Sequence, residues 1–233
     1  MKPQVYEDPR PQEYFQRFHE RTRRRRPDLV YNLVRALVTP YLRILYGARC
    51  IDASNVPVHG PAIITPNHFS FLDHFFIGIC LSRKVHFMAK SQLFKRPMQF
   101  VYSHGGVFPV RRGRRDEEAF KTAHAVLARG DIVVMYGEGG RSRSGRLGEP
   151  KSGLGRLALE SGVAVVPAAI VGSAGVRNWK RLEFPKVTVR YGVPIEVERV
   201  ELPTREQAQA TSEKIFTEVS KLYYELQGRR HRA

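Results

Sequence analysis

The stretch PAIITPNHFSFLDHFFIG, Pro61 to Gly78, decides the fold because it combines a buried strand, a break and the start of a helix. The apolar run AIIT predicts a strand that is covered on both faces, and a helix is expected from about Leu72 to Leu81. His68 and Asp73 lie close to the break. In α/β sheets, ligands gather at the carboxyl ends of strands. The stretch therefore predicts a polar site at the edge of such a sheet.

The chain beyond Gly47 repeats this alternation of strands and helices. Further strands are expected in VHFMAK, GGVFPV, DIVVMYGEGG and VAVVPAAIVG, with one or two edge strands in KVTVRYGVPIEV. Helices are expected over about 116–130, 153–162 and 205–226. This order predicts an α/β fold in which helices flank a mostly parallel or mixed sheet, with 47–233 as a single domain.

The N-terminal region is expected to differ from this domain. Residues 1–28 are polar and end with five arginines between Arg21 and Arg26, which predicts a basic flexible arm. Residues 29–46 predict an amphipathic helix with a wide apolar face and a kink at Pro40. That face either packs on its own domain or lies in a membrane interface beside anionic headgroups. We expect neither a signal peptide nor a membrane-spanning helix.

The charge balance narrows the possible partners. The chain has 39 Lys and Arg against 22 Asp and Glu, a formal net charge of +17. Such an excess attracts nucleic acid, an anionic membrane or phosphorylated substrates. A basic nucleic-acid-binding protein is the second hypothesis, although the sequence shows no established nucleic-acid-binding motif. Cys50 and Cys80 are too few for a disulfide framework or a four-cysteine zinc site, which fits a reducing cytoplasm.

His68 and Asp73 are the candidate catalytic pair. A carboxylate that holds an imidazole fixes its tautomer, and the imidazole can then take a proton from an attacking hydroxyl. The alternative is that the two residues only cap the helix or close a turn. No Ser or Cys lies in a nucleophile-elbow context, so direct attack by a substrate hydroxyl is expected. His74 suggests a metal, but the ligand spacing of a zinc site is missing, and we expect no metal or cofactor.

Two further segments carry polar groups to the ends of predicted strands. In YGEGGRSRSG, Gly139 and Gly140 let the backbone approach a ligand, and Arg141 could grip a phosphate. In GGVFPVRRG, Arg111 and Arg112 could supply a second phosphate contact. An ordinary loop and a solvated strand end are the alternatives for these two segments.

Taken together, four blocks resemble the glycerolipid acyltransferases. They are NHFSFLD, GGVFPVRR, GEGGRS and VVPAAI, in that order, over about Ile63 to Ile170. The resemblance is greatest to the bacterial 1-acyl-sn-glycerol-3-phosphate acyltransferases, the lysophosphatidic acid acyltransferase group. It implies a mostly parallel α/β fold with a membrane-docking N-terminal helical element, and transfer of an acyl group to the free hydroxyl of 1-acylglycerol 3-phosphate. The donor would be acyl-CoA or acyl carrier protein.

The resemblance also implies roles for individual residues. His68 would be the general base and Asp73 would orient it. Arg112 would bind the acceptor phosphate, and residues of the third block would shape the site around it: Glu138, Gly139, Gly140, Arg141 and Ser142. Val166 and Pro167 of the fourth block would bind the acyl donor.

This sequence departs from the family pattern in the third block. Tyr136 and Gly137 stand where the family commonly has Phe-Pro, and Gly140 replaces a Thr. The departures leave another lysophospholipid or glycerol 3-phosphate open as acceptor. The expected location is the cytoplasmic face of the membrane, as a peripheral enzyme whose partners are its acyl donor, a lysophospholipid and an anionic surface, without nucleic acid.

Overall fold

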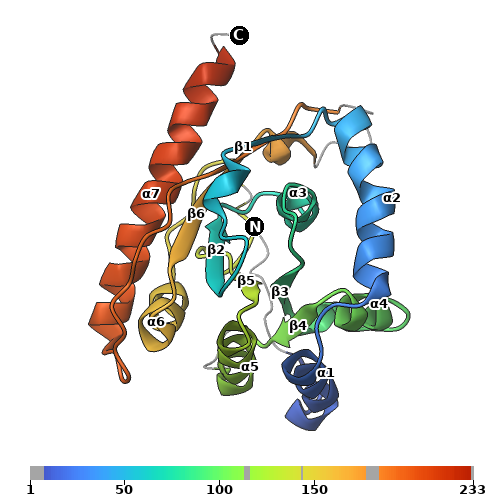
Figure 1. The fold of residues 1–233 in the computed structure, drawn as a ribbon, viewed down its shortest axis with the longest axis vertical. Coiled ribbons are helices and arrows are strands. Elements are labelled where there is room, and N and C mark those ends of the chain that lie inside the picture. The colour runs from blue at the N-terminus through green and yellow to red at the C-terminus, as the bar shows by residue number, and fades with distance from the viewer. Residues whose placement is uncertain (1–7, 113–115, 143, 177–183, 232–233) are drawn as a thin grey trace.

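The computed structural model describes residues 8–112, 116–142, 144–176 and 184–231. Within these residues, seven strands form one sheet in the order β1-β7-β6-β2-β5-β3-β4 (Figure 1). Every pairing is parallel except the antiparallel pair β6–β7. The expected mostly parallel α/β sheet is confirmed. The strands are β1 (Arg49–Ile51), β2 (Ala62–Pro66), β3 (Val85–Lys90), β4 (Val107–Val110), β5 (Ile132–Val134), β6 (Val165–Val171) and β7 (Thr188–Tyr191).

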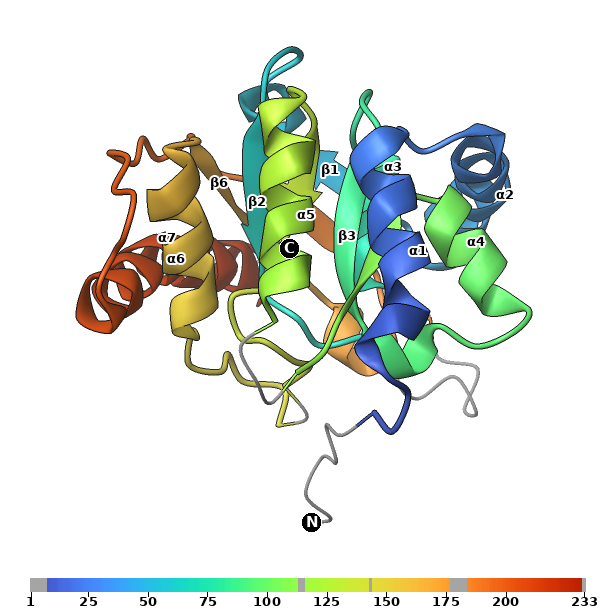
Figure 2. The same cartoon turned by 90° about the horizontal axis from the view of Figure 1, so that it is seen from below.

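Helices cover both faces of this sheet, as Figures 1 and 2 show. Helix α3 packs on one face, α5 and α6 pack on the other, and the long α7 lies beside α6. All the expected helices are present, whereas α1, α4 and the short strand β1 were not predicted. The helices are α1 (Gln12–Arg24), α2 (Leu29–Leu45), α3 (Asp73–Ile79), α4 (Met98–His104), α5 (Glu117–Ala128), α6 (Ser152–Ser161) and α7 (Arg205–His231), with short 3₁₀ turns at Ala53–Asn55 and Ser91–Leu93.

Strand β2 occupies the centre of the core, and all five of its residues are buried. Successive side chains on a strand point to opposite faces. Ile64 accordingly joins the apolar cluster under α3, while Ile63 joins the cluster under α5 and α6. Burial on both faces explains the uninterrupted apolar run in the sequence.

The N-terminal arm needs a correction, because residues 12–24 form helix α1. Phe15 and Phe18 are three residues apart, so they share one helix face, and both are buried against Phe94. Helix α1 packs on α5 and on β4. The arginine at position 23 pairs with Glu118 at 2.8 Å. The prediction of a loosely ordered arm is therefore wrong for this segment; residues 1–7 lie outside the described part of the chain.

Helix α2 is present where it was predicted, with Pro40 inside it. Asp28 caps its N-terminus, and the Asp28 carboxylate accepts the Val30 N–H at 3.0 Å. The helix contacts α3 and α4, and only Tyr31 and Leu42 among its residues are buried. No helix of the described residues is both long and apolar enough to cross a bilayer. The interfacial role of α2 remains a prediction.

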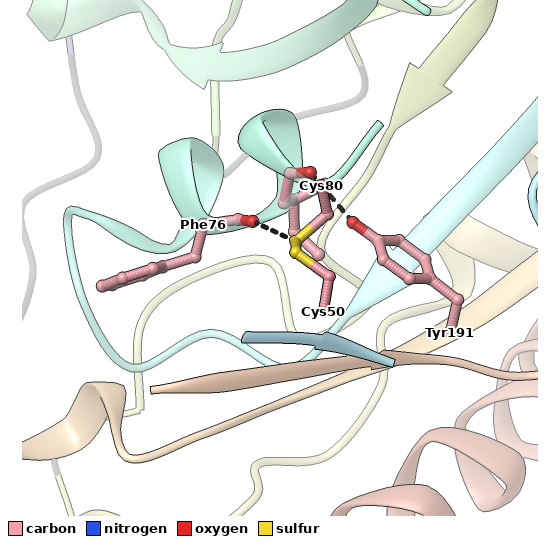
Figure 3. Close-up of a disulfide and its surroundings, with 5 residues drawn as sticks. Cys50, Phe76, Cys80 and Tyr191 are labelled. Carbon is pink, nitrogen blue, oxygen red and sulfur yellow. Dashed lines mark hydrogen bonds between the residues drawn. A yellow bond between two sulfur atoms is a disulfide. The ribbon is translucent and has the colours of Figure 1, made fainter. Parts of the chain in front are cut away.

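A disulfide joins Cys50 on β1 to Cys80 at the end of α3, with the Cα atoms 5.7 Å apart (Figure 3). Beside it, Tyr191 of β7 donates its hydroxyl proton to the carbonyl oxygen of Ile77 at 2.9 Å. The sheet edge is thus tied to α3 twice. The two cysteines are too few for a disulfide framework, but they form this single disulfide, which was not predicted from the sequence. Disulfides are rare in reducing compartments, so this bond does not support the expected cytoplasmic location.

Candidate active site

His68 and Asp73 meet in the segment between β2 and α3. His68 Nδ1 lies 2.9 Å from Asp73 Oδ2. The same carboxylate oxygen accepts the backbone N–H groups of Phe69 and Ser70, each at 2.7 Å. Asp73 is fully buried as the first residue of α3, so three hydrogen bonds fix its position. Because Nδ1–H points at the carboxylate, Nε2 is the ring nitrogen left to accept a proton from a substrate.

The environment of His68 keeps the imidazole neutral. Burial lowers the pKa of His68 below its usual range, and the positive charges of Arg112 and Arg141 act in the same direction. The hydrogen bond with Asp73 opposes them. A neutral imidazole at physiological pH can act as a general base, and the aspartate then stabilises the imidazolium that forms.

Tyr136 covers the ring of His68. The two rings stack with their centroids 3.9 Å apart and an angle of 21° between their planes. Burial raises the pKa of Tyr136 well above its usual value, so its hydroxyl stays protonated. Sequence reasoning noted Tyr136 only as a departure from the family pattern. The end of β5 (Ile132–Val134), which pairs with β2, brings it beside His68.

Glu138 holds the backbone around the pair and does not face the cavity as a ligand-binding group. One carboxylate oxygen accepts the His68 backbone N–H at 2.8 Å, and the other accepts the Gly148 N–H at 2.7 Å. Burial raises the pKa of Glu138 to about 6. The role implied by the family, shaping the acceptor site, fits a residue that links the histidine to the loop after β5.

The turn that follows Glu138 brings a guanidinium to the histidine. Gly139 has a φ of +67°, which favours glycine, and Gly140 follows it. The Ser142 N–H donates to the His68 carbonyl oxygen at 2.8 Å. This bond closes the turn, so Arg141 lines the same cavity as His68.

That cavity has a volume of about 140 Å³, and positively charged side chains line it around the imidazole. Lys90 at the end of β3 and Arg112 just beyond β4 line it together with Arg141. Three cations around one small space favour an anionic ligand such as a phosphate. We refer to this space as the basic cavity. Lys90 was not predicted as a site residue, although its position at the end of a predicted strand could have identified it.

A second cavity, of about 180 Å³, adjoins the first between α2, α3 and α4. Its walls are mainly apolar and include Val34, Val38, Ile79 and Val101. Five residues line both cavities: Phe71, His74, Phe87, Tyr102 and Val107. We call it the apolar cavity. It suits a hydrocarbon chain whose polar end lies near His68.

The fourth-block residues lie elsewhere. Val166 and Pro167 are buried in β6, paired with Ile64 and Thr65 of β2. Val166 belongs to the core under α3, and neither residue lines the basic or the apolar cavity. The structure therefore does not support their expected contact with the acyl donor, because both side chains are buried away from the two cavities. Among the described residues, no three His, Cys, Asp or Glu side chains could share a metal ion.

The site thus consists of an imidazole that a carboxylate holds in a basic cavity, at the carboxyl ends of the parallel strands, and such an imidazole can act as a general base. The acyltransferase family model matches residues 48–171, slightly more than half of the chain. The chain belongs to the acyltransferase family.

Two relatives carry acyltransferase names, and a solved structure has a similar fold. A chloroplastic 1-acyl-sn-glycerol-3-phosphate acyltransferase of Arabidopsis thaliana is 34% identical over 119 residues, which are 50% of this chain and 33% of the relative. The chain thus spans about a third of that plant relative. The enzyme of the same name from Bacillus subtilis is 26% identical, with 76% of this chain and 88% of the relative covered. The fold is similar to that of the 1-acyl-sn-glycerophosphate acyltransferase PlsC from Thermotoga maritima, with a TM-score of 0.59, 21% identity, and 90% of this chain and 88% of that chain covered.

Proposed function

We propose that this protein transfers a fatty acyl group from an acyl thioester to the free hydroxyl of 1-acylglycerol 3-phosphate, giving phosphatidic acid for phospholipid synthesis. The observation that carries the proposal is the His68–Asp73 pair facing a cavity lined by Arg112 and Arg141. The names of the relatives from Arabidopsis thaliana and Bacillus subtilis support the same reaction.

The geometry of the site supports the following reaction. The cations of the basic cavity bind the acceptor phosphate, which holds the free hydroxyl against His68 Nε2. The imidazole takes the hydroxyl proton while the oxygen attacks the thioester carbonyl carbon. The tetrahedral intermediate collapses, the carbon–sulfur bond breaks, and the imidazolium returns the proton to the leaving thiolate. Asp73 stabilises the imidazolium between these steps, so no covalent enzyme intermediate is needed.

The apolar cavity provides a place for a hydrocarbon chain. Because it adjoins the basic cavity, an acyl chain inside it would leave its carbonyl group near His68. Burying apolar surface contributes roughly 0.8 kcal/mol per CH₂ group. The donor is acyl-CoA or acyl carrier protein, and the geometry is compatible with either.

Helix α2 is the proposed membrane contact. Leu29, Leu33, Leu37 and Ile44 are 80%, 61%, 66% and 78% exposed, a row of large apolar side chains turned to solvent. Three exposed arginines, 24 to 26, immediately precede this helix. Apolar residues and a basic cluster together favour an anionic bilayer surface. We propose that the protein works at such a surface as a peripheral enzyme.

Purified protein supplied with radiolabelled acyl-CoA or acyl carrier protein tests the proposal. The acceptor panel is 1-acylglycerol 3-phosphate, glycerol 3-phosphate and other lysophospholipids. His68→Ala is expected to abolish transfer, whereas the matched variant of the exposed His59, His59→Ala, keeps it. Near-normal turnover by His68→Ala would refute the assigned base.

Arg141→Ala separates phosphate binding from chemistry. It is expected to raise the KM for the phosphorylated acceptor, while Arg146→Ala in the same loop, outside the basic cavity, leaves KM unchanged. A selective loss of donor binding would place the phosphate elsewhere. Flotation with anionic liposomes, set beside a nucleic-acid mobility shift at physiological salt, distinguishes the membrane partner from the nucleic-acid alternative.

A further inference from the structure

His74 stands where the two cavities meet, and the reaction described above does not use it. It lines both the basic cavity, with His68, and the apolar cavity, with Val34 and Ile79. It follows Asp73 directly in α3. A ligand that reaches from one cavity into the other must therefore pass its ring.

The surroundings of His74 are aromatic. Its ring centroid is 4.1 Å from that of Phe75, and Phe71 and Phe87 meet it edge-on at 5.0 and 5.8 Å. Three rings thus hold the imidazole in place. This contact set fixes the plane of the ring without supplying it with a hydrogen bond.

Within the part of the chain that the structure describes, neither ring nitrogen of His74 has a hydrogen-bond partner. Other histidines are paired: His19 with Thr122, His104 with Asp28, and His124 with Glu160. The His74 side chain is half-buried and lines both cavities, so its ring nitrogens can reach a molecule that is bound there. A phenylalanine would fill the same aromatic setting but would offer such a molecule no hydrogen bond.

The charge state of His74 narrows the chemistry of that molecule. Burial lowers its pKa to about 4, and the neighbouring His68 acts in the same direction. The ring is therefore neutral at physiological pH and offers one N–H donor. A neutral donor is poorly matched to a phosphate, for which the basic cavity has Arg112 and Arg141, and well matched to a carbonyl oxygen.

We propose that His74 donates a hydrogen bond to the carbonyl oxygen at the head of an acyl chain whose hydrocarbon tail occupies the apolar cavity. The inference rests on the proposed acyl transfer and adds a residue that recognises the acyl linkage itself. The carbonyl can belong to the ester of the lysophospholipid or to the thioester of the donor. Both present the same acceptor atom followed by the same apolar tail.

Equilibrium binding to compounds with and without the carbonyl tests this, without relying on turnover. In one arm, 1-acylglycerol 3-phosphate is compared with the 1-O-alkyl ether of equal chain length. In the other, a 2-oxoalkyl-CoA, which keeps the carbonyl, is compared with the S-alkyl-CoA, which lacks it. In the arm that contains the true ligand, the wild type is expected to prefer the carbonyl compound by about 3- to 10-fold.

His74→Phe keeps an aromatic ring and removes the donor, so it is expected to abolish that preference. His74→Gln keeps a donor and should retain part of it, which guards against a variant that merely folds badly. His59→Phe introduces the same side chain at an exposed histidine outside both cavities and should leave the preference intact.

The outcomes separate the two proposals. A preference that is lost only in His74→Phe supports the inference, and the arm in which it occurs identifies the ester or the thioester. Equal preference in wild type and His74→Phe, or no preference in either arm of the wild type, overturns it. Absence of transfer to every acceptor in the activity assay would remove the proposed function, while the binding comparison would still report on His74.

Discussion

Tyr136 lies flat on His68, with 3.9 Å between the ring centroids. This stack withholds water from one face of the imidazole, and burial is the largest cause of the lowered pKa of His68. The tyrosine thus helps to keep the candidate base unprotonated, which links a residue outside the predicted catalytic pair to the proposed proton transfer.

Replacing the ring should move the pH dependence of the reaction. In Tyr136→Leu, water reaches the imidazole, so the pKa of His68 rises toward its usual value of about 6.5. The acid limb of the profile of kcat/KM against pH should then shift to higher pH. Tyr136→Phe keeps the stack and should leave the limb in place. Equal shifts in both variants would show that the hydroxyl matters instead of the ring.

Glu138 makes a second testable contribution. Its carboxylate accepts two backbone N–H groups, one from His68 and one from Gly148. Glu138→Gln can accept only one of them, because its amide nitrogen is itself a donor, and an unpaired buried N–H costs about 1–3 kcal/mol. We expect a lower Tm and a kcat reduced by about 10-fold or more. Thermal unfolding and steady-state kinetics measure the two effects, and unchanged values in both would contradict the assigned role.

Stability should fall in mild acid because of His19. This residue is buried between α1 and α5, where its Nδ1 lies 2.9 Å from Thr122 Oγ1, and burial lowers its pKa to about 4. Between pH 6.5 and 4 the unfolded chain binds a proton that the folded chain does not, so stability rises with pH across this window. From pH 7 to 5, His19 should cost the folded state about 2 kcal/mol.

Comparison with His19→Gln isolates this contribution from those of the other histidines. Denaturant unfolding at pH 7 and pH 5 measures the free energy of unfolding of both proteins. The loss on acidification should be smaller in the variant by about 2 kcal/mol. An identical loss in the two proteins would mean that His19 is protonated in the folded state.

The Cys50–Cys80 disulfide should stabilise the fold by closing a loop in the unfolded chain. With a sequence separation of 30 residues, the expected contribution is about 3–4 kcal/mol. The double variant Cys50→Ser, Cys80→Ser is compared with the wild type in denaturant unfolding, with and without reductant. Reductant should lower the stability of the wild type and leave the variant unchanged. A wild type that does not respond to reductant would contain free thiols.

The sequence predicted most elements of this fold and the contact between His68 and Asp73, and the misses have physical causes. Alternation of apolar strands and amphipathic helices is a local property, so β2, α5 and α6 could be predicted. The spacing of His68 and Asp73 is also local. At the end of α1, the five arginines between Arg21 and Arg26 favoured a flexible arm, and the two phenylalanines that pack this helix on the core were overlooked.

Other features depend on which strands are neighbours. Tyr136 reaches His68 because β5 pairs with β2, and Val166 is internal because β6 pairs with β2 on its other side. No short segment of the sequence determines the order of the strands in the sheet. The disulfide was not predicted for the same reason, since Cys50 and Cys80 meet only when β1 lies under the end of α3.

Helix α1 also has a consequence for how the protein behaves in concentrated solution. Strand β4 (Val107–Val110) ends the sheet, and exposed terminal strands tend to recruit strands from other molecules. Here α1 and α4 pack against β4, and the guanidinium of Arg111 donates to the carbonyl oxygens of Asp8 and Arg10. A segment that looks like a polar tail therefore shields the sheet from aggregation, and deleting it would be expected to promote self-association before it impairs chemistry.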